Sequence, residues 1–415
     1  MFSFIKSITI LPKLQIKYAL IFILIIWIIG LFFSRFLQSV ATISSCLLFI
    51  PSIINHTKNW KKYQTSLIGI SFFIIVLVYF IPILYSQNQV SFWNIFKNKI
   101  PFLFLPMTIL SIGYIEKKWT DLLTYLFIIC CLLSSIWSYH QYLQNIDLYT
   151  NLYTHGQVLP TLIHHIPFAV LLSIGLLFSL FNMLKKISVK EKIVNTFFAI
   201  WLFYFIHVLS VRTGLILTYT GLILFIIILL LKLKNIVFTI GFTSIIMIIS
   251  ILAYKNITTI QHKINYTKYG LSLFKNGQDT LNQVSDSRRF LSDEIGIELI
   301  KQHPILGVGF GDLQDEMDTI YKQRYPLFQQ DVYSHIHNQY LYTIAGSGLI
   351  MGILFIIALL LPLIQFVKWQ KWQFSMLYCM LLLVMLWEAF LQNQIGTSIY
   401  LIIVILGVIS TKEDA

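Results

Sequence analysis

Polar side chains gather just before a long apolar run near the C-terminal end of the chain. In the stretch DVYSHIHNQYLYTIAGSGLIMGILF, which begins at Asp331, His337 is followed by Asn338 and Tyr340. Histidine changes protonation near neutral pH, so His337 could act as a general base or stabilise developing charge. A hydrogen-bonded structural histidine is the alternative. A zinc pair with His335 is not favoured, because the surrounding segment has no cysteine or HxxxH partner.

Three arginines could bind an anion. Arg212, in HVLSVRTGLILTYTG, stands near a predicted helix N-terminus, where amide donors and the helix dipole favour negative charge. It could instead simply extend to the membrane surface. Arg288 and Arg289 open another predicted helix, where ion pairs with Asp286 and Asp293 are the alternative. Taken together, the arginines predict a bidentate clamp for a diphosphate, which arginine suits better than lysine.

A single carboxylate, Glu388, occurs in WEAFLQNQIG at the end of an apolar run. A carboxylate beside a membrane span usually has a partner and a function. We therefore predict that Glu388 pairs with one of the arginines or orients His337. The acidic stretch DLQDEMD, which begins at Asp312, lacks the spacing of a calcium loop and is interpreted as a solvated face. No metal site is predicted.

Composition places these residues in a membrane protein. Hydrophobic residues make up 57% of the chain and charged residues 11%, far fewer charges than the roughly 25% of soluble domains. The apolar runs are continuous and about 20 residues long, as in spanning helices, rather than alternating as in β-barrels. We expect an all-α polytopic membrane protein with about twelve transmembrane helices, centred near Ile25, Leu47, Val76, Pro106, Ile129, Leu172, Trp201, Leu222, Ile245, Phe355, Leu383 and Ile403.

This count divides the chain into three parts. Residues 1–254 would hold spans one to nine, residues 255–337 one large, partly helical periplasmic loop, and residues 338–415 spans ten to twelve. In the loop, a helix should start at Ser285–Ser287, end at His303 and Pro304, and lead into a tight glycine-rich turn at 307–311. Its predicted apolar side consists of Phe290, Ile295, Ile297, Leu299 and Ile300.

Charge predicts the orientation in the membrane. With the N-terminus inside, most lysines fall in the inner connections, and few basic residues fall in the short outer ones. This asymmetry predicts cytoplasmic termini and places the long loop outside. The net charge of +13 is thus explained by lysines that face anionic membrane lipid and needs no nucleic acid.

The motifs around His337 resemble those of a known family. HPILGVGFGD followed by HNQYLYTIAGSGLIMGILF is similar to the signature region of the O-antigen ligase/polymerase family of bacterial membrane glycosyltransferases. His337 and Asn338 match the family's HN pair. Arg289 stands at the arginine of its R-x-x-x-W element, with Asp293 where tryptophan is common, so Arg288 stays open as the alternative.

Two further elements extend the resemblance. LSVRTG looks like the family's S-R-x-G element and carries Ser210 and Arg212. EAFLQNQIG is similar to its late E-x-x-LE-x-Q-x-G element, with Glu388 in place and Gln392 at the second acidic position. Four motifs in this order on one predicted membrane face are more specific than any of them alone.

The resemblance implies glycan transfer from undecaprenyl diphosphate to a hydroxyl acceptor, outside the bacterial inner (cytoplasmic) membrane, with inversion and without metal or cofactor. Arg212 and Arg289 would stabilise the leaving diphosphate. His337 would activate the acceptor hydroxyl or hydrogen-bond the diphosphate. The predicted substrate-binding residues are Arg288, Asn338, Tyr340, Glu388, Gln392 and Ser210.

The acceptor separates the remaining alternatives. One dominant late loop favours an O-antigen ligase that uses lipid A-core, ahead of a polymerase that extends the lipid-linked glycan. A protein O-oligosaccharyltransferase comes third, because such members are usually longer. A transporter or flippase is the alternative outside the family, but the chain shows no paired halves with matching broken helices.

Overall fold

A computed structural model describes residues 13–55, 57–111, 113–185, 187–233, 236–276, 285–325 and 335–410. Helices are the only regular secondary structure in these ranges, which confirms the all-helical fold class. The chain divides into two compact units: residues Met1–Leu123 with Arg288–Ala415, and residues Thr124–Ser287. They are called the first and the second unit below.

The first unit contains the site described in the next section. Its elements are α2 (Lys13–Phe33), α3 (Arg35–Leu47), α4 (Phe49–Asn55), α5 (Thr57–Gln64), α6 (Leu67–Phe80), η1 (Ile81–Leu84), α7 (Gln89–Phe96), η2 (Lys97–Lys99), α8 (Ile100–Leu110), α17 (Leu313–Arg324), α18 (Gln339–Lys368), α19 (Trp372–Val384), η5 (Phe390–Gln392) and α20 (Gln394–Ile409). Most of α16 (Ser285–Gln302) and the start of α9 (Lys117–Gln144) also belong to it.

The second unit contains the rest of α9, together with α10 (Ile146–Thr154), α11 (His165–Leu184), α12 (Val189–Leu209), α13 (Arg212–Leu233), α14 (Ile236–Asn256) and α15 (Thr258–Asn276). Helix α11 is buried almost throughout, as expected of a helix that is apolar on all sides. Ser173 of α11 hydrogen-bonds Thr218 of α13 at 2.9 Å, which holds the start of α13 against the core of this unit.

Seven helices in the described ranges are long and apolar enough to cross a membrane. They contain the predicted centres Ile25, Val76, Ile129, Leu172, Trp201, Leu222 and Phe355. The predicted centres Leu47, Pro106, Leu383 and Ile403 lie in helices of 16 residues or fewer, and Ile245 lies in α14. The count of about twelve spans and the loop arrangement built on it stay predictions.

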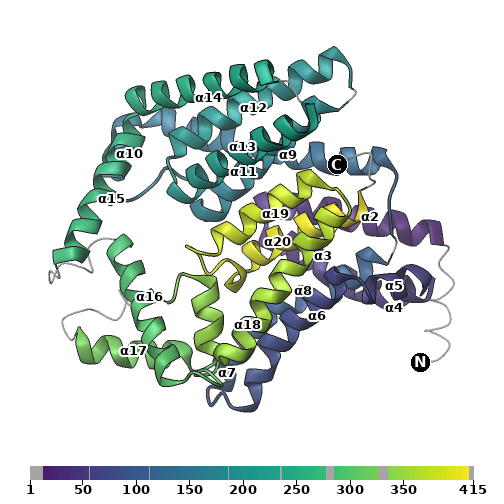
Figure 1. Cartoon of the computed structure of the whole chain (residues 1–415), viewed down its shortest axis with the longest axis vertical. Helices are drawn as coiled ribbons and strands as arrows, with labels where there is room; N and C mark the ends of the chain where they lie inside the picture. The colour runs from purple at the N-terminus through teal and green to yellow at the C-terminus, as the bar shows by residue number, and fades with distance from the viewer. Residues whose placement is uncertain are drawn as a thin grey trace. The chain divides into compact units, whose positions relative to one another are not determined.

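The core of the first unit is built on α6, α18 and α20. Helices α6 and α18 run antiparallel and side by side (Figure 1): Tyr79 hydrogen-bonds Thr343 near one end, and the Ser71 hydroxyl donates to the Ala358 carbonyl near the other. Residues 395–407 of α20 are all buried.

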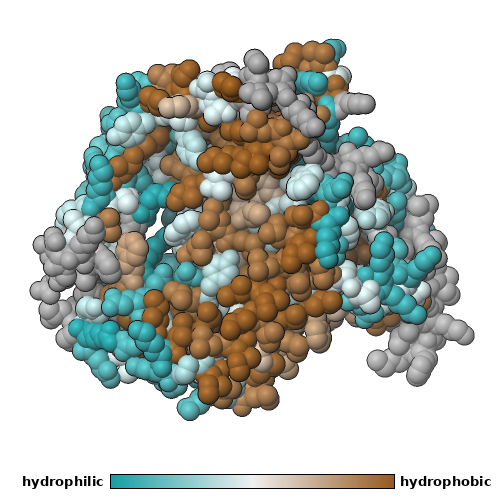
Figure 2. All heavy atoms as spheres, in the orientation of Figure 1, coloured by the Kyte–Doolittle hydropathy of each residue, from teal (hydrophilic) through white to brown (hydrophobic). Residues whose placement is uncertain are grey.

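Helix α18 also has an exposed apolar face, formed by Leu349, Ile350, Ile353 and Ile357. Figure 2 shows apolar surface over α18 and polar surface over α17, a division that fits α18 facing lipid.

A break in α18 receives the glycine-rich turn that follows α16. Gly348 has a left-handed φ of 80° inside α18. The turn supplies substitute hydrogen bonds: Val308 N–H donates to the Ala345 carbonyl at 2.8 Å, and Leu349 N–H donates to the Pro304 carbonyl at 2.8 Å. The free N–H and C=O groups of a broken helix turn need such partners. The turn predicted at 307–311 is confirmed, and its hydrogen bonds connect the end of α16 to α18.

We predict that Gly348→Ala destabilises the protein by about 3 kcal/mol or more. An added Cβ would lie 1.9 Å from the carbonyl oxygen of Ile305, at a φ that alanine rarely adopts. Gly241→Ala is the matched control, since an added Cβ there meets nothing within 4 Å. Thermal unfolding in detergent should show a lower Tm for Gly348→Ala only. Equal Tm values for the two variants would contradict this account of the break.

The loop helix has the predicted ends but a different buried face. Helix α16 starts at Ser285 and ends at Gln302, directly before His303 and Pro304, as expected. The apolar side chains that it buries are Leu291, Ile295 and Leu299, whereas Phe290 and Ile297 are exposed. Placing Phe290 and Ile297 on the apolar side was therefore wrong. At 100° per residue, positions 291, 295 and 299 share one face, and positions 290 and 297 point away from it.

Candidate active site

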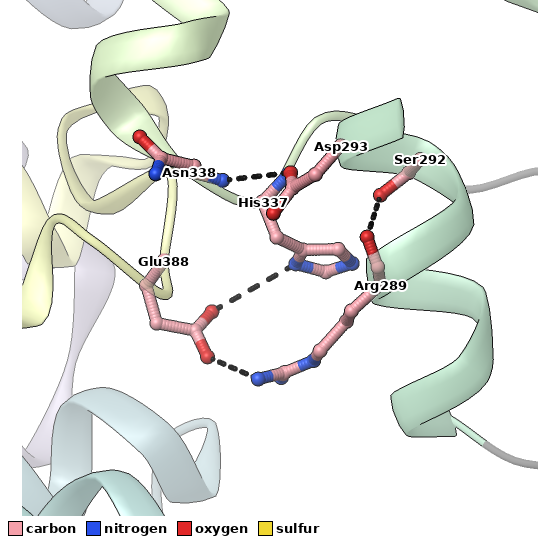
Figure 3. Close-up of polar contacts among 6 residues, drawn as sticks. All are labelled: Arg289, Ser292, Asp293, His337, Asn338 and Glu388. Carbon is pink, nitrogen blue, oxygen red and sulfur yellow. Dashed lines mark hydrogen bonds and ion pairs between the residues drawn. The ribbon is translucent and has the colours of Figure 1, made fainter. Parts of the chain in front are cut away.

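Three segments of the first unit bring Arg289, His337 and Glu388 together (Figure 3). Arg289 comes from α16, His337 stands just before α18, and Glu388 lies between α19 and η5. The Arg289 Nη1 to Glu388 Oε1 distance is 2.8 Å, and Glu388 Oε2 lies 4.0 Å from His337 Nδ1. The carboxylate thus lies between the guanidinium and the imidazole. Of the two arginines open from the sequence, Arg289 is the one that the structure pairs with Glu388.

All three side chains are largely shielded from water. The exposed fraction is 26% for Arg289, 16% for His337 and 12% for Glu388. A charge pair that is this buried is poorly screened, so removing either partner leaves the other charge uncompensated. A guanidinium has five N–H donors, so a single carboxylate contact does not exhaust the capacity of Arg289 to bind an anion.

His337 is neutral at physiological pH. Burial lowers its pKa to about 3, and the positive charges of Arg289 and Arg288 and the neighbouring His335 act in the same direction. The 4.0 Å separation from Glu388 is longer than a hydrogen bond, and with a neutral ring it is not an ion pair. A neutral imidazole can accept a proton, so His337 is in the form that a general base requires.

Asp293 fixes the main chain at His337. Its Oδ1 accepts the N–H groups of His337 at 3.1 Å and Asn338 at 3.2 Å (Figure 3). Burial raises the pKa of Asp293, while these two hydrogen bonds and the charge of Arg289 oppose that rise. Because Asp293 follows Arg289 by four residues, both side chains project from one face of α16. From the sequence, Asp293 was expected to form an ion pair, and its hydrogen bonds to the main chain at His337 were missed. The four-residue spacing from Arg289 was the signal that could have placed Asp293 at the site.

Asn338 and Tyr340 have structural contacts. Asn338 is the N-cap of α18, and its side-chain oxygen accepts the N–H groups of Tyr340 and Leu341 at 2.9 and 3.1 Å. The Tyr340 hydroxyl donates to the Leu382 carbonyl at 2.9 Å. These contacts set where α18 begins and hence where His337 stands. Substrate binding by the two residues stays a prediction.

Two more predicted residues lie near the same arrangement. Arg288 is half-buried, and its Nε finds no hydrogen-bond acceptor in the described part of the chain. An unsatisfied buried donor beside Arg289 is consistent with the predicted anion clamp. The Gln392 amide donates to the hydroxyl of Tyr79 at 3.0 Å, so Gln392 joins the Glu388 segment to α6. Direct substrate contact by Gln392 stays a prediction.

Arg212 and Ser210 belong to the second unit. Ser210 is the C-cap of α12; it has a left-handed φ of 48° and donates its hydroxyl proton to the His207 carbonyl. The Tyr153 hydroxyl donates to the Leu209 carbonyl at 2.8 Å and further braces this turn. Arg212 is the first residue of α13, which is the helix N-terminus predicted for it. Joint action of Arg212 with Arg289 remains a prediction.

Comparison with known families identifies the segment that carries these motifs. Residues 197–356 match the family model described as O-antigen ligase. This part of the chain is therefore similar to the O-antigen ligase family. The matched segment includes Arg212, Arg289 and His337, whereas Glu388 and Gln392 lie beyond it. Comparison with curated proteins gives no match. Members of this family are membrane glycosyltransferases of the ligase or polymerase type, which supports an enzyme of that general class.

Proposed function

We propose that the protein is an O-antigen ligase, which transfers a glycan from undecaprenyl diphosphate to a hydroxyl group of lipid A-core. The observation that carries this proposal is the Arg289–Glu388–His337 arrangement in a chain with a segment similar to the O-antigen ligase family. In this arrangement the guanidinium can bind a phosphate group, and the neutral imidazole can accept the proton of a hydroxyl group. The carboxylate lies between them. The long predicted loop, residues 255–337, favours a ligase over a polymerase.

In the proposed reaction, the acceptor oxygen attacks the anomeric carbon as the bond from that carbon to the diphosphate oxygen breaks. The configuration inverts, and undecaprenyl diphosphate leaves with the bonding electron pair. Arg289 stabilises the growing negative charge, with Arg288 and Arg212 as further cations. The mechanism uses no metal and no cofactor.

His337 receives the proton from the acceptor hydroxyl. Its Nδ1 faces Glu388, so Nε2 is the nitrogen left for the acceptor. Once the ring is protonated, the Glu388 carboxylate compensates the new charge, while its contact with Arg289 keeps the guanidinium in place. Glu388 thereby couples the group that binds the leaving diphosphate to the group that accepts the proton.

The proposed location is the bacterial inner membrane, with both termini cytoplasmic and the site on the periplasmic side. Helices α6 and α18 support this orientation. Their lysine-rich ends, near Lys58–Lys62 and at Lys368, lie opposite the ends that adjoin the site, near Tyr85 and His337. Lysines gather on the cytoplasmic side of membrane proteins, so the site would open to the periplasm.

Product analysis tests the function. Purified protein in nanodiscs receives undecaprenyl-diphosphate-linked glycan with or without lipid A-core, and the products are separated on a gel. A ligase moves the glycan onto lipid A-core and makes no product without it. Lengthened lipid-linked glycan with no transfer to lipid A-core would instead identify a polymerase. Transfer to neither acceptor would overturn both activities and point first to a protein acceptor, and then to a transporter.

The low pKa of His337 predicts the pH dependence of this reaction. In the free enzyme the ring takes up its proton well below the usual histidine range, so the neutral base persists as the pH falls through 6.5. We expect kcat/KM to show no histidine inflection between about pH 5.5 and 8, because this parameter reports the free enzyme. A loss of kcat/KM with a midpoint near pH 6.5 would contradict the assignment.

A further inference from the structure

A buried lysine in the first unit contacts the segment that carries Glu388, and the proposed mechanism does not use it. Lys99, at the end of η2, has 0% exposure. Its ammonium group donates to the main-chain carbonyl of Leu391 and lies 4.5 Å from the centre of the Tyr79 ring. Within the described ranges it forms no ion pair with a carboxylate. Burial lowers the pKa of Lys99 to about 7. Because burying a lysine without a carboxylate partner is costly, such a group indicates a specific requirement.

Gln339 is a second buried group at the same place. It follows His337 by two residues and is fully buried. Its amide N–H donates to the hydroxyl of Tyr79 at 2.8 Å, and its amide oxygen accepts the N–H of Leu391 at 2.7 Å. Its own main-chain N–H donates to the Met385 carbonyl at 2.8 Å. Gln339 therefore ties the start of α18 to the segment that follows α19.

That segment, residues 385–393, carries Glu388 and contains only the short helix η5. Side chains from other elements hold its main chain. Gln339 binds the Leu391 N–H, Lys99 binds the Leu391 carbonyl, and Asn98 donates to the Gln392 carbonyl at 3.1 Å. A regular helix would fix Glu388 through its own ladder of hydrogen bonds. Glu388 keeps one hydrogen bond of this kind, from its N–H to the Val384 carbonyl of α19 at 3.0 Å. The residues that follow Glu388 leave the helix, and the contacts to Leu391 and Gln392 hold them in addition to local turns.

We propose that Lys99 and Gln339 are positioning residues for glycan transfer, which hold the segment 385–393 so that Glu388 meets Arg289 and faces His337. Neither residue touches the reacting atoms in this proposal. The inference rests on the proposed function, because the reaction is what makes the position of Glu388 matter. Lys99 is the more informative residue to test, since it stands far from His337 in the sequence.

A double-mutant cycle tests this role. Lys99→Met keeps the length of the side chain and removes its charge and donors. We expect it to lower kcat about 10- to 100-fold in the wild-type background, as displacement of a reacting group does. In a Glu388→Gln background, the same change should lower kcat less than about 2-fold, because the group that Lys99 positions is already lost. Asn98→Ala should show a smaller loss with the same dependence on Glu388.

Two lysines provide matched controls. Lys371 is also fully buried and donates to the Gly407 and Ser410 carbonyls, which lie at the opposite end of α20 from Glu388. If Lys371→Met lowers kcat, it should do so by the same factor in the wild-type and Glu388→Gln backgrounds, because it would act only through general stability. Lys97 is exposed in the same short helix as Lys99, and Lys97→Met should leave kcat unchanged. A Lys99→Met loss independent of Glu388, or no loss, would overturn the proposal.

Hydrogen exchange separates this inference from the proposed function. The exchange rates of the amides in residues 385–393 are compared between wild-type protein and Lys99→Met in nanodiscs, without substrate. Faster exchange confined to this segment in the variant supports the positioning role, even if the wild-type protein transfers no glycan. Unchanged exchange in this segment would overturn the role whatever the activity.

Discussion

Arg289→Lys is expected to lower kcat/KM for glycan transfer by about 100- to 1000-fold. Lysine keeps the charge but loses the planar pair of donors that can bind Glu388 and a phosphate oxygen together. The 2.8 Å contact with Glu388 would be lost or weakened in a site where both side chains are largely buried. Steady-state kinetics with the lipid-linked donor and lipid A-core measure the effect.

Arg324→Lys is the matched control for this prediction. Arg324 also pairs with a glutamate, Glu298, in the first unit, but the arginine is 42% exposed. Exposed ion pairs contribute little, so this change should alter kcat/KM by less than about 2-fold. Losses of similar size in the two variants would show that Arg289 acts only through general stability.

His337→Gln is expected to lower kcat by about 100- to 10,000-fold, the range for removal of a general base. Glutamine can still form a hydrogen bond but cannot take up the proton of the acceptor hydroxyl. The affinity for the lipid-linked donor should stay unchanged, because Arg289 rather than His337 binds the diphosphate in this account. Single-turnover rates and donor binding, measured on the same preparation, separate the two quantities.

His303→Gln serves as the control for the loss of a histidine. His303 is exposed at the end of α16 and lies in the same unit, so its replacement should leave both rate and affinity unchanged. Weakened donor binding in His337→Gln, together with an unchanged rate from the bound state, would make His337 a diphosphate ligand. That outcome would contradict its assignment as the base.

Local signals in the sequence predicted much of the site. Capping residues at 285–287 and Pro304 mark the ends of α16, because such residues and proline act over a few positions. The glycines at 307–311 predicted the tight turn for the same reason. Pairing of Glu388 with an arginine followed from the high cost of an isolated charge beside an apolar span.

Long-range contacts could not be predicted in this way. Asp293 binds the amides of His337 and Asn338, which lie more than 40 residues later in the chain, and no local pattern specifies that contact. No local pattern distinguishes Lys99 from an exposed lysine such as Lys97, yet Lys99 is fully buried. Its burial depends on the packing of segments separated by almost 300 residues, which hydrophobic periodicity does not encode.

One measurement tests the central claim most directly, namely that Arg289, Glu388 and His337 together transfer a glycan from a lipid diphosphate to a hydroxyl. Protein saturated with undecaprenyl-diphosphate-linked glycan is mixed with lipid A-core, and the glycosylated acceptor and the released undecaprenyl diphosphate are followed through one turnover. The account predicts that both products form together in the wild-type protein. It predicts that both are lost in His337→Gln, although the donor stays bound. Unchanged product formation in that variant, or transfer without release of the diphosphate, would contradict it.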